Sequence, residues 1–78
     1  MLNLVLLLVS LERMEDAEAV ATESQSAAAF HEVGLAFGRV GRHAEAARSF
    51  AACLELEPDH PTARMNLEYA QRAGLGGP

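Results

Sequence analysis

The sequence predicts a small all-α domain built from antiparallel helical hairpins, with about five helices in all. Alanine fills 15 of the 78 positions, and isoleucine and tryptophan, which favour strands, are absent. Apolar residues recur at helical spacing along most of the chain. Breakers at Gly41 and Pro58 divide its middle into helix-length runs. At this length we expect a single domain.

Residues 1–26 are predicted to form a first, degenerate helical hairpin. Eight of the first eleven residues are Leu or Val, and residues 4–9 are an unbroken apolar run. A helix that is apolar on every side is normally buried on every side, and a chain this short has few other units to cover it. We therefore expect this run to form an interface with a partner or another copy, through Leu2, Leu4, Leu6, Leu8 and Val9.

Three explanations for this apolar helix compete. In the first, it packs against a second copy of the chain or exchanges with it, which makes a homo-oligomer. In the second, the chain belongs to a longer helical array whose preceding unit covers it. In the third, it is a targeting segment. The third fits least, because the run is far shorter than the ~20 residues of a membrane span and no basic stretch precedes it. We therefore expect no membrane span.

A helix is predicted over residues 27–39. Phe30, Val33 and Phe37 recur at helical spacing, so they place one apolar face toward a core. Gly34 and Gly38 lie inside this helix, where each costs about 1 kcal/mol relative to alanine. We therefore expect both glycines to be needed for the close approach of another helix.

A second helix is predicted over residues 43–57, because Pro58 cannot continue it. Its apolar and small residues are Ala46, Ala47, Phe50, Cys53, Leu54 and Leu56. We expect the small residues of these two helices to pack against the large ones across a helical hairpin.

A closing helix is predicted over residues 61–73. Pro61 suits its first position, and Thr62 or Asp59 is expected to cap it. The Gly-rich residues 74–78 are expected to be a flexible tail. A single closing helix of this kind would cover the end of a repeat array.

Residues 30–58 also follow a repeat pattern of aromatic, apolar, small and proline positions: Phe30, Val33, Gly34, Phe37, Ala46, Phe50 and Pro58. This segment resembles a tetratricopeptide repeat, with one clear unit over about residues 27–60. The resemblance implies a right-handed α-solenoid of helical hairpins. Residues 1–26 align with the clear unit when Arg13 is placed on Arg42, an offset of 29 residues against a usual period of about 34.

The resemblance also implies where a partner would bind, because the first helix of each pair lines a concave groove in this family. The groove residues expected on this basis are His31, Leu35, Arg39, Met65, Tyr69 and Arg72. Tyr and Arg often anchor partners, and Arg also suits carboxylates. The alternative is that Leu35 and Met65 are ordinary core residues and that the arginines only keep the surface soluble.

Some members of the family hold the C-terminal carboxylate of chaperones with a clamp of Lys, Asn and Arg. This sequence has no Lys, and Glu32 stands where the clamp would place an Asn. Because an acidic residue there would repel a carboxylate, binding of chaperone tails is disfavoured.

No catalytic residues are predicted. The pair His31-Glu32 lacks the second His of an H-E-x-x-H zinc site, and the three histidines fall on different elements, so no metal or cofactor is expected. Cys53 is expected to be a small apolar core residue. The net charge of −5 argues against nucleic-acid binding. A single cysteine fits a reducing compartment, so a cytoplasmic location is expected.

These observations predict a non-catalytic protein–protein interaction module that binds a peptide or helix of a partner in a groove. The alternative is a self-assembling, homo-oligomeric structural element built through the apolar N-terminal helix.

Overall fold

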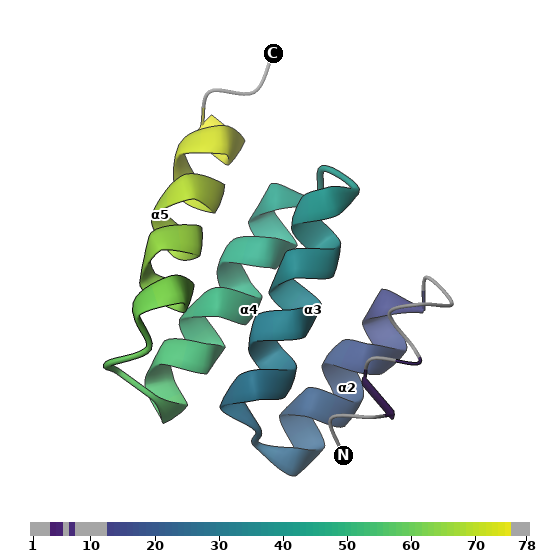
Figure 1. Cartoon of the computed structure of the whole chain (residues 1–78). Helices are drawn as coiled ribbons and strands as arrows, with labels where there is room; N and C mark the ends of the chain where they lie inside the picture. Colours follow the sequence, from purple (N-terminus) through teal and green to yellow (C-terminus); the bar gives the residue numbers. More distant parts are fainter. Residues whose placement is uncertain (1–3, 6, 8–12, 76–78) are drawn as a thin grey trace.

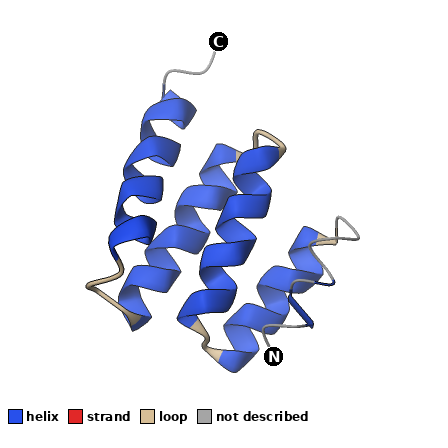
Figure 2. Ribbon diagram, viewed as in Figure 1, coloured by secondary structure: helices blue, strands red, loops and turns tan. Residues whose placement is uncertain are grey.

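The computed structural model describes residues 4, 5, 7 and 13–75, which are helical apart from short turns (Figure 1). Four helices have defined bounds: α2 (Met14–Ser24), α3 (Ala27–Arg39), α4 (His43–Leu56) and α5 (Pro61–Leu75). No strand occurs in these parts of the chain, so the prediction of an all-α fold is confirmed (Figure 2). The four helices follow one another side by side in chain order, and α3, α4 and α5 run alternately up and down (Figure 1).

The predicted bounds of the helices are close to those observed. The helix predicted over residues 27–39 has these bounds, and the next one ends at Leu56, one residue early. The closing helix extends to Leu75, two residues further than predicted. Local signals mark several of these boundaries. The hydroxyl of Ser26 accepts from the N–H of Ala29 at the start of α3, Gly41 follows the end of α3, and Pro58 follows the end of α4.

The N-terminal helix of the predicted first hairpin falls largely outside the described residues. Leu2, Leu6, Leu8 and Val9 of the predicted interface lie outside them. Leu4 and Leu7 are 45% and 55% exposed, while Val5 is fully buried. Four helices therefore have described bounds, and the total of about five stays a prediction.

The core lies along α3 and α4, where Val33, Phe37 and Cys53 are fully buried. Gly34 is the point of closest approach between these helices, because a Cβ there would lie 2.6 Å from Cε1 of Phe50. The expectation that Gly38 also allows the close approach of another helix is wrong. A Cβ at Gly38 would meet no other atom within 4 Å, so this glycine borders open space.

The turn between α3 and α4 contains Gly41, which ends α3, followed by Arg42. Gly41 has a φ of +83°, a conformation that favours glycine. The N–H of Gly41 donates to the carbonyl oxygen of Gly38 (3.1 Å), and the N–H of Arg42 donates to that of Phe37 (2.9 Å). This pair of bonds is the Schellman motif, which satisfies carbonyls at a helix end. The Arg42 guanidinium then lies 4.8 Å from the centroid of the Phe37 ring, where it covers the aromatic face.

The start of α5 is capped by a histidine. Nδ1 of His60 accepts a hydrogen bond from the N–H of Ala63 (3.0 Å), so His60 satisfies one of the free donors of the first turn. The expectation that Thr62 or Asp59 performs this role is therefore wrong. Pro61 is the first helical residue, as predicted, because its missing N–H costs nothing there.

Helices α2 and α4 are equivalent in their first turns. They begin at residues 14 and 43, and the preceding residues, Arg13 and Arg42, have similar backbone angles (φ −98°, ψ 64° and φ −87°, ψ 71°). Ala17 and Ala46 are both fully buried. However, α2 has 11 residues against 14 in α4, and two residues connect α2 to α3 against four between α4 and α5. The segment from the start of α2 to the start of α3 is thus five residues shorter than the segment from the start of α4 to the start of α5.

Candidate functional site

A hollow of about 220 Å³ lies where α3, α4 and α5 meet. Its lining comprises Gly34, Leu35, Gly38 and Arg39 from α3, His43, Ala46 and Phe50 from α4, and Asn66, Tyr69 and Ala70 from α5. Gly38 contributes to this hollow, because a Cβ there would meet no other atom within 4 Å. The lining is mainly apolar, with polar groups from three helices.

Three of the six predicted groove residues line this hollow: Leu35, Arg39 and Tyr69. Tyr69 is 64% exposed, so most of its ring is accessible to a partner. Leu35 is partly buried against the core, which means that it belongs both to the wall of the hollow and to the packing beneath it.

The other three predicted residues lie outside the lining. Met65 is 68% exposed on α5, one turn before Tyr69, and Arg72 is also exposed. His31 is half-buried, and its Nε2 lies 3.3 Å from Nδ2 of Asn66. His31 therefore contributes to the site through Asn66 rather than through its own surface.

Two polar lining residues were not among the groove residues predicted from the sequence. Asn66 comes from α5, and His43 is the first residue of α4. The His43 ring stands edge-on to Tyr69, with centroids 6.4 Å apart. Its Nδ1 is buried and has no hydrogen-bond partner among the described residues. The position of His43 two residues after Gly41 was the signal in the sequence, since it places the ring near the end of α3.

The charge of the hollow differs from that of the chain as a whole. Arg39 is the charged residue of the lining, which contains no carboxylate, whereas the chain carries a net charge of −5. Within residues 13–75, Arg39 and Arg72 form no ion pair. Two cationic side chains on α3 and α5 are therefore accessible to a ligand.

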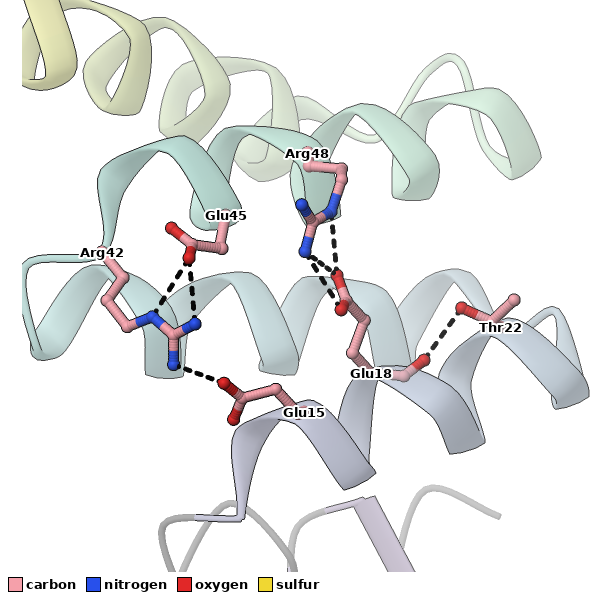
Figure 3. A network of polar contacts seen from close by, with 6 residues as sticks. All are labelled: Glu15, Glu18, Thr22, Arg42, Glu45 and Arg48. Carbon is pink, nitrogen blue, oxygen red and sulfur yellow. Dashed lines mark hydrogen bonds and ion pairs between the residues drawn. The ribbon is translucent and has the colours of Figure 1, made fainter.

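The carboxylates that pair with arginine are found instead between α2 and α4 (Figure 3). Arg42 contacts Glu15 of α2 and Glu45 of α4, each at 2.9 Å, and Arg48 contacts Glu18 at 2.8 Å. Hydrogen bonds from Arg42 lower the pKa of both Glu15 and Glu45, and these carboxylates raise the pKa of Arg42. This network joins helices and leaves the hollow free of acidic groups.

The parts of the chain that the structure describes hold no group of three or more His, Cys, Asp or Glu that suits a metal ion. Cys53 is buried, and this burial raises the pKa of its thiol, so the nucleophilic thiolate is disfavoured. Ser49 is also buried, and its hydroxyl has no partner in this region. Neither Cys53 nor Ser49 lines the hollow, whose polar lining residues are Arg39, His43, Asn66 and Tyr69.

Comparison of the chain with models of protein families, with curated proteins and with solved structures returned no match. Among the helices of the described residues, none is both long enough and apolar enough to span a membrane.

Proposed function

We propose that this protein is a non-catalytic interaction module that binds a peptide segment of another protein in the hollow between α3 and α5. The observation that carries the proposal is the meeting of Leu35 and Arg39 with Tyr69 across this hollow. Arg and Tyr are the side chains that most often anchor protein partners, and a concave, mostly apolar site with a few polar groups is the usual form of a ligand site.

A tetratricopeptide-like arrangement is part of this proposal, and the spacing of the helices supports it. Helix α3 begins at residue 27 and α5 at residue 61, a separation of 34 residues, which is the period of that repeat. Ala29 and Ala63 are equivalent under this shift and both fully buried. Ala36 and Ala70 are likewise equivalent, each 3% exposed. In such an arrangement α3 and α5 are successive first helices that line the same groove.

The lining indicates the chemistry of the peptide. A volume of about 220 Å³ accommodates a side chain rather than a whole helix. Because the lining offers Arg39 and no carboxylate, the peptide is expected to place an apolar side chain in the hollow and a neutral or acidic group beside Arg39. The amide of Asn66 is placed to bond the peptide backbone.

Selection from a library of random short peptides, displayed on phage, tests this proposal because it samples many peptide sequences at once. The informative variant is Gly38→Leu, which fills the hollow from α3 and has room to do so. We expect peptides selected on the native protein to lose at least about tenfold in affinity for this variant, because the pocket for their apolar side chain is closed.

Ala44→Leu is the matched control, since Ala44 is an exposed residue of α4 outside the hollow. It adds the same side chain and should leave peptide binding unchanged. Equal binding to native protein and to Gly38→Leu, or a library that yields no enriched peptide, would contradict the proposal.

The alternative function, self-assembly through the N-terminal helix, has one supporting observation. Leu4 and Leu7 are helical and exposed, and residues three apart lie on the same face of a helix. A second copy of the chain would bury these side chains, and the solution mass tests this.

A further inference from the structure

Two histidines touch at the point where α5 joins the rest of the protein. His31 belongs to α3, and His60 precedes the first residue of α5. Their ring centroids are 4.8 Å apart and the rings are tilted by 38°. The His31 ring also packs on Phe50 of α4, with centroids 5.8 Å apart. The pair thus connects three helices.

Both histidines use a ring nitrogen as a hydrogen-bond acceptor toward α5. Nδ1 of His60 accepts from the N–H of Ala63 (3.0 Å). Nε2 of His31 lies 3.3 Å from Nδ2 of Asn66, and it accepts from this amide in the tautomer that carries the ring proton on Nδ1. A protonated imidazole has no free lone pair, so it cannot accept at either nitrogen. The bond from Ala63 therefore requires a neutral His60 ring, and a bond from the Asn66 amide requires a neutral His31 ring.

The groups around the pair act on a proton in opposite directions. Burial and the neighbouring His60 disfavour protonation of His31, whereas the carboxylate of Glu32, whose Oε2 lies 4.0 Å from Nδ1 of His31, favours it. From α5, Arg64 faces the same turn and donates to the carbonyl oxygen of Pro58 (3.0 Å). From α4, the apolar ring of Phe50 covers His31. In the turn, Glu57 and Asp59 are exposed to solvent. The remaining titratable contact between α4 and α5 is that of His43 with Tyr69.

We propose that His31 and His60 form a pH-dependent latch that holds α5 in place while both rings are neutral and releases it when either ring is protonated. Protonation of His60 removes the cap of α5, and protonation of His31 removes the bond to Asn66. Protonation of both also places two cations in contact, which repel each other. Each event weakens the attachment of the same helix.

Linkage gives the direction of the effect. Burial, and then the neighbouring His60, hold the pKa of His31 below its ordinary value of 6.5. Because the pKa of His31 is lowered in the closed state, His31 binds a proton more tightly in the state in which α5 is released. The closed state therefore loses stability as pH falls below 6.5. The carboxylates of Glu15 and Glu45 titrate at lower pH, since Arg42 lowers their pKa values. On acidification, the latch is therefore expected to open at a higher pH than that at which the carboxylates of the network are protonated.

Release of α5 would also open the hollow, because Asn66 and Tyr69 form its α5 wall. This consequence rests on the proposed function, whereas the latch itself does not. An acid-induced loss of peptide binding would follow only if both hold.

Amide hydrogen exchange, with protection factors corrected for the intrinsic rate at each pH, tests the latch in the absence of any partner. We expect the protection of α5 amides to fall by at least about threefold between about pH 7.5 and pH 5.5. Protection in the centres of α3 and α4 should fall less, because their own hydrogen bonds are not touched.

The double variant His31→Gln with His60→Asn separates the latch from a general effect of acid. Asn is a good helix cap and does not titrate, so this variant should keep α5 protected at both pH values. His43→Gln is the matched control, since it removes the third histidine and should preserve the pH response. The latch is refuted if the double variant responds like the native protein, if His43→Gln abolishes the response, or if all helices lose protection equally.

Discussion

Gly34 of α3 lies directly against the ring of Phe50 of α4, so closely that a Cβ on Gly34 would come within 2.6 Å of Cε1 and 2.8 Å of Cδ1. No real Cβ approaches another atom at that distance. The missing side chain is what allows the two central helices to share one core. Because Phe50 is 3% exposed, its ring has little room to move away.

Gly34→Ala is therefore expected to destabilise the protein although alanine favours helix. Overpacking of a filled core costs about 1–3 kcal/mol, which exceeds the gain of about 1 kcal/mol in helix propensity. Urea unfolding followed by circular dichroism measures the change.

Gly38→Ala is the matched control on the same helix, where a Cβ meets open space. It should raise the free energy of unfolding by about 1 kcal/mol. A pair of variants that change stability in the same direction would contradict the assignment of Gly34 as the helix contact.

These two glycines also show how far sequence reasoning extends. Both cost the same helix propensity and both stand on α3, so the sequence predicts the same role for each. The difference depends on the angle at which α4 crosses α3, which places Phe50 over Gly34 and leaves Gly38 beside the hollow. Helix bounds were predictable because Gly41 and Pro58 act locally. The close approach of another helix at Gly34 was also predicted and is confirmed, but the sequence could not separate Gly34 from Gly38.

Only part of the candidate site was predictable from the sequence. Leu35, Arg39 and Tyr69 were expected from the resemblance, which assigns a groove to the first helix of each pair, and they line the hollow. Asn66 and His43 enter it through the way α4 and α5 pack, which no local pattern records. His60 was missed as the cap of α5 because Thr and Asp are commoner caps, and a histidine in this role depends on its ring being neutral.

Arg42 is expected to make the protein sensitive to acid. The carboxyl groups of Glu15 and Glu45 have pKa values lowered below 4.5 by hydrogen bonds with Arg42. A lowered acidic pKa stabilises the folded state above the unfolded value, and this stability is lost as pH falls through the folded value. Arg42→Gln should therefore lower the stability at neutral pH and reduce its further loss below pH 4.5. Denaturant titrations at several pH values measure both effects.

Arg39→Gln provides the comparison for Arg42→Gln. Arg39 forms no ion pair with the described residues, so its removal should leave the acid dependence of stability unchanged. If the two variants lose stability with acid in the same way, the network between α2 and α4 does not hold the helices together.

Gln25→Gly is expected to stabilise the turn between α2 and α3. Gln25 has a φ of 51° and a ψ of 48°, a left-handed conformation that costs residues with a side chain about 1–2 kcal/mol. Glycine removes this cost but adds about 0.4–1 kcal/mol of unfolded-state entropy, so a net gain of about 0.5–1 kcal/mol is expected. Thermal unfolding measures this change in stability. Gly41→Ala is the reverse substitution at another positive φ, 83°, and should lower the stability. A loss of stability in Gln25→Gly would show that its side chain matters more than its backbone angle.

Leu4 and Leu7 are expected to join two copies of the chain. Both are exposed although Val5 between them is fully buried, so among these three residues one faces the core and two face solvent. Light scattering over about a hundredfold range of concentration should then give a mass above that of one chain, because association depends on concentration. Leu4→Glu with Leu7→Glu should give the monomer mass throughout, since two buried carboxylates at one interface repel each other. Circular dichroism must show the same helicity in both proteins. A native protein that stays monomeric at every concentration would remove self-assembly as a function, and the exposed leucines would then have to be explained by a different partner.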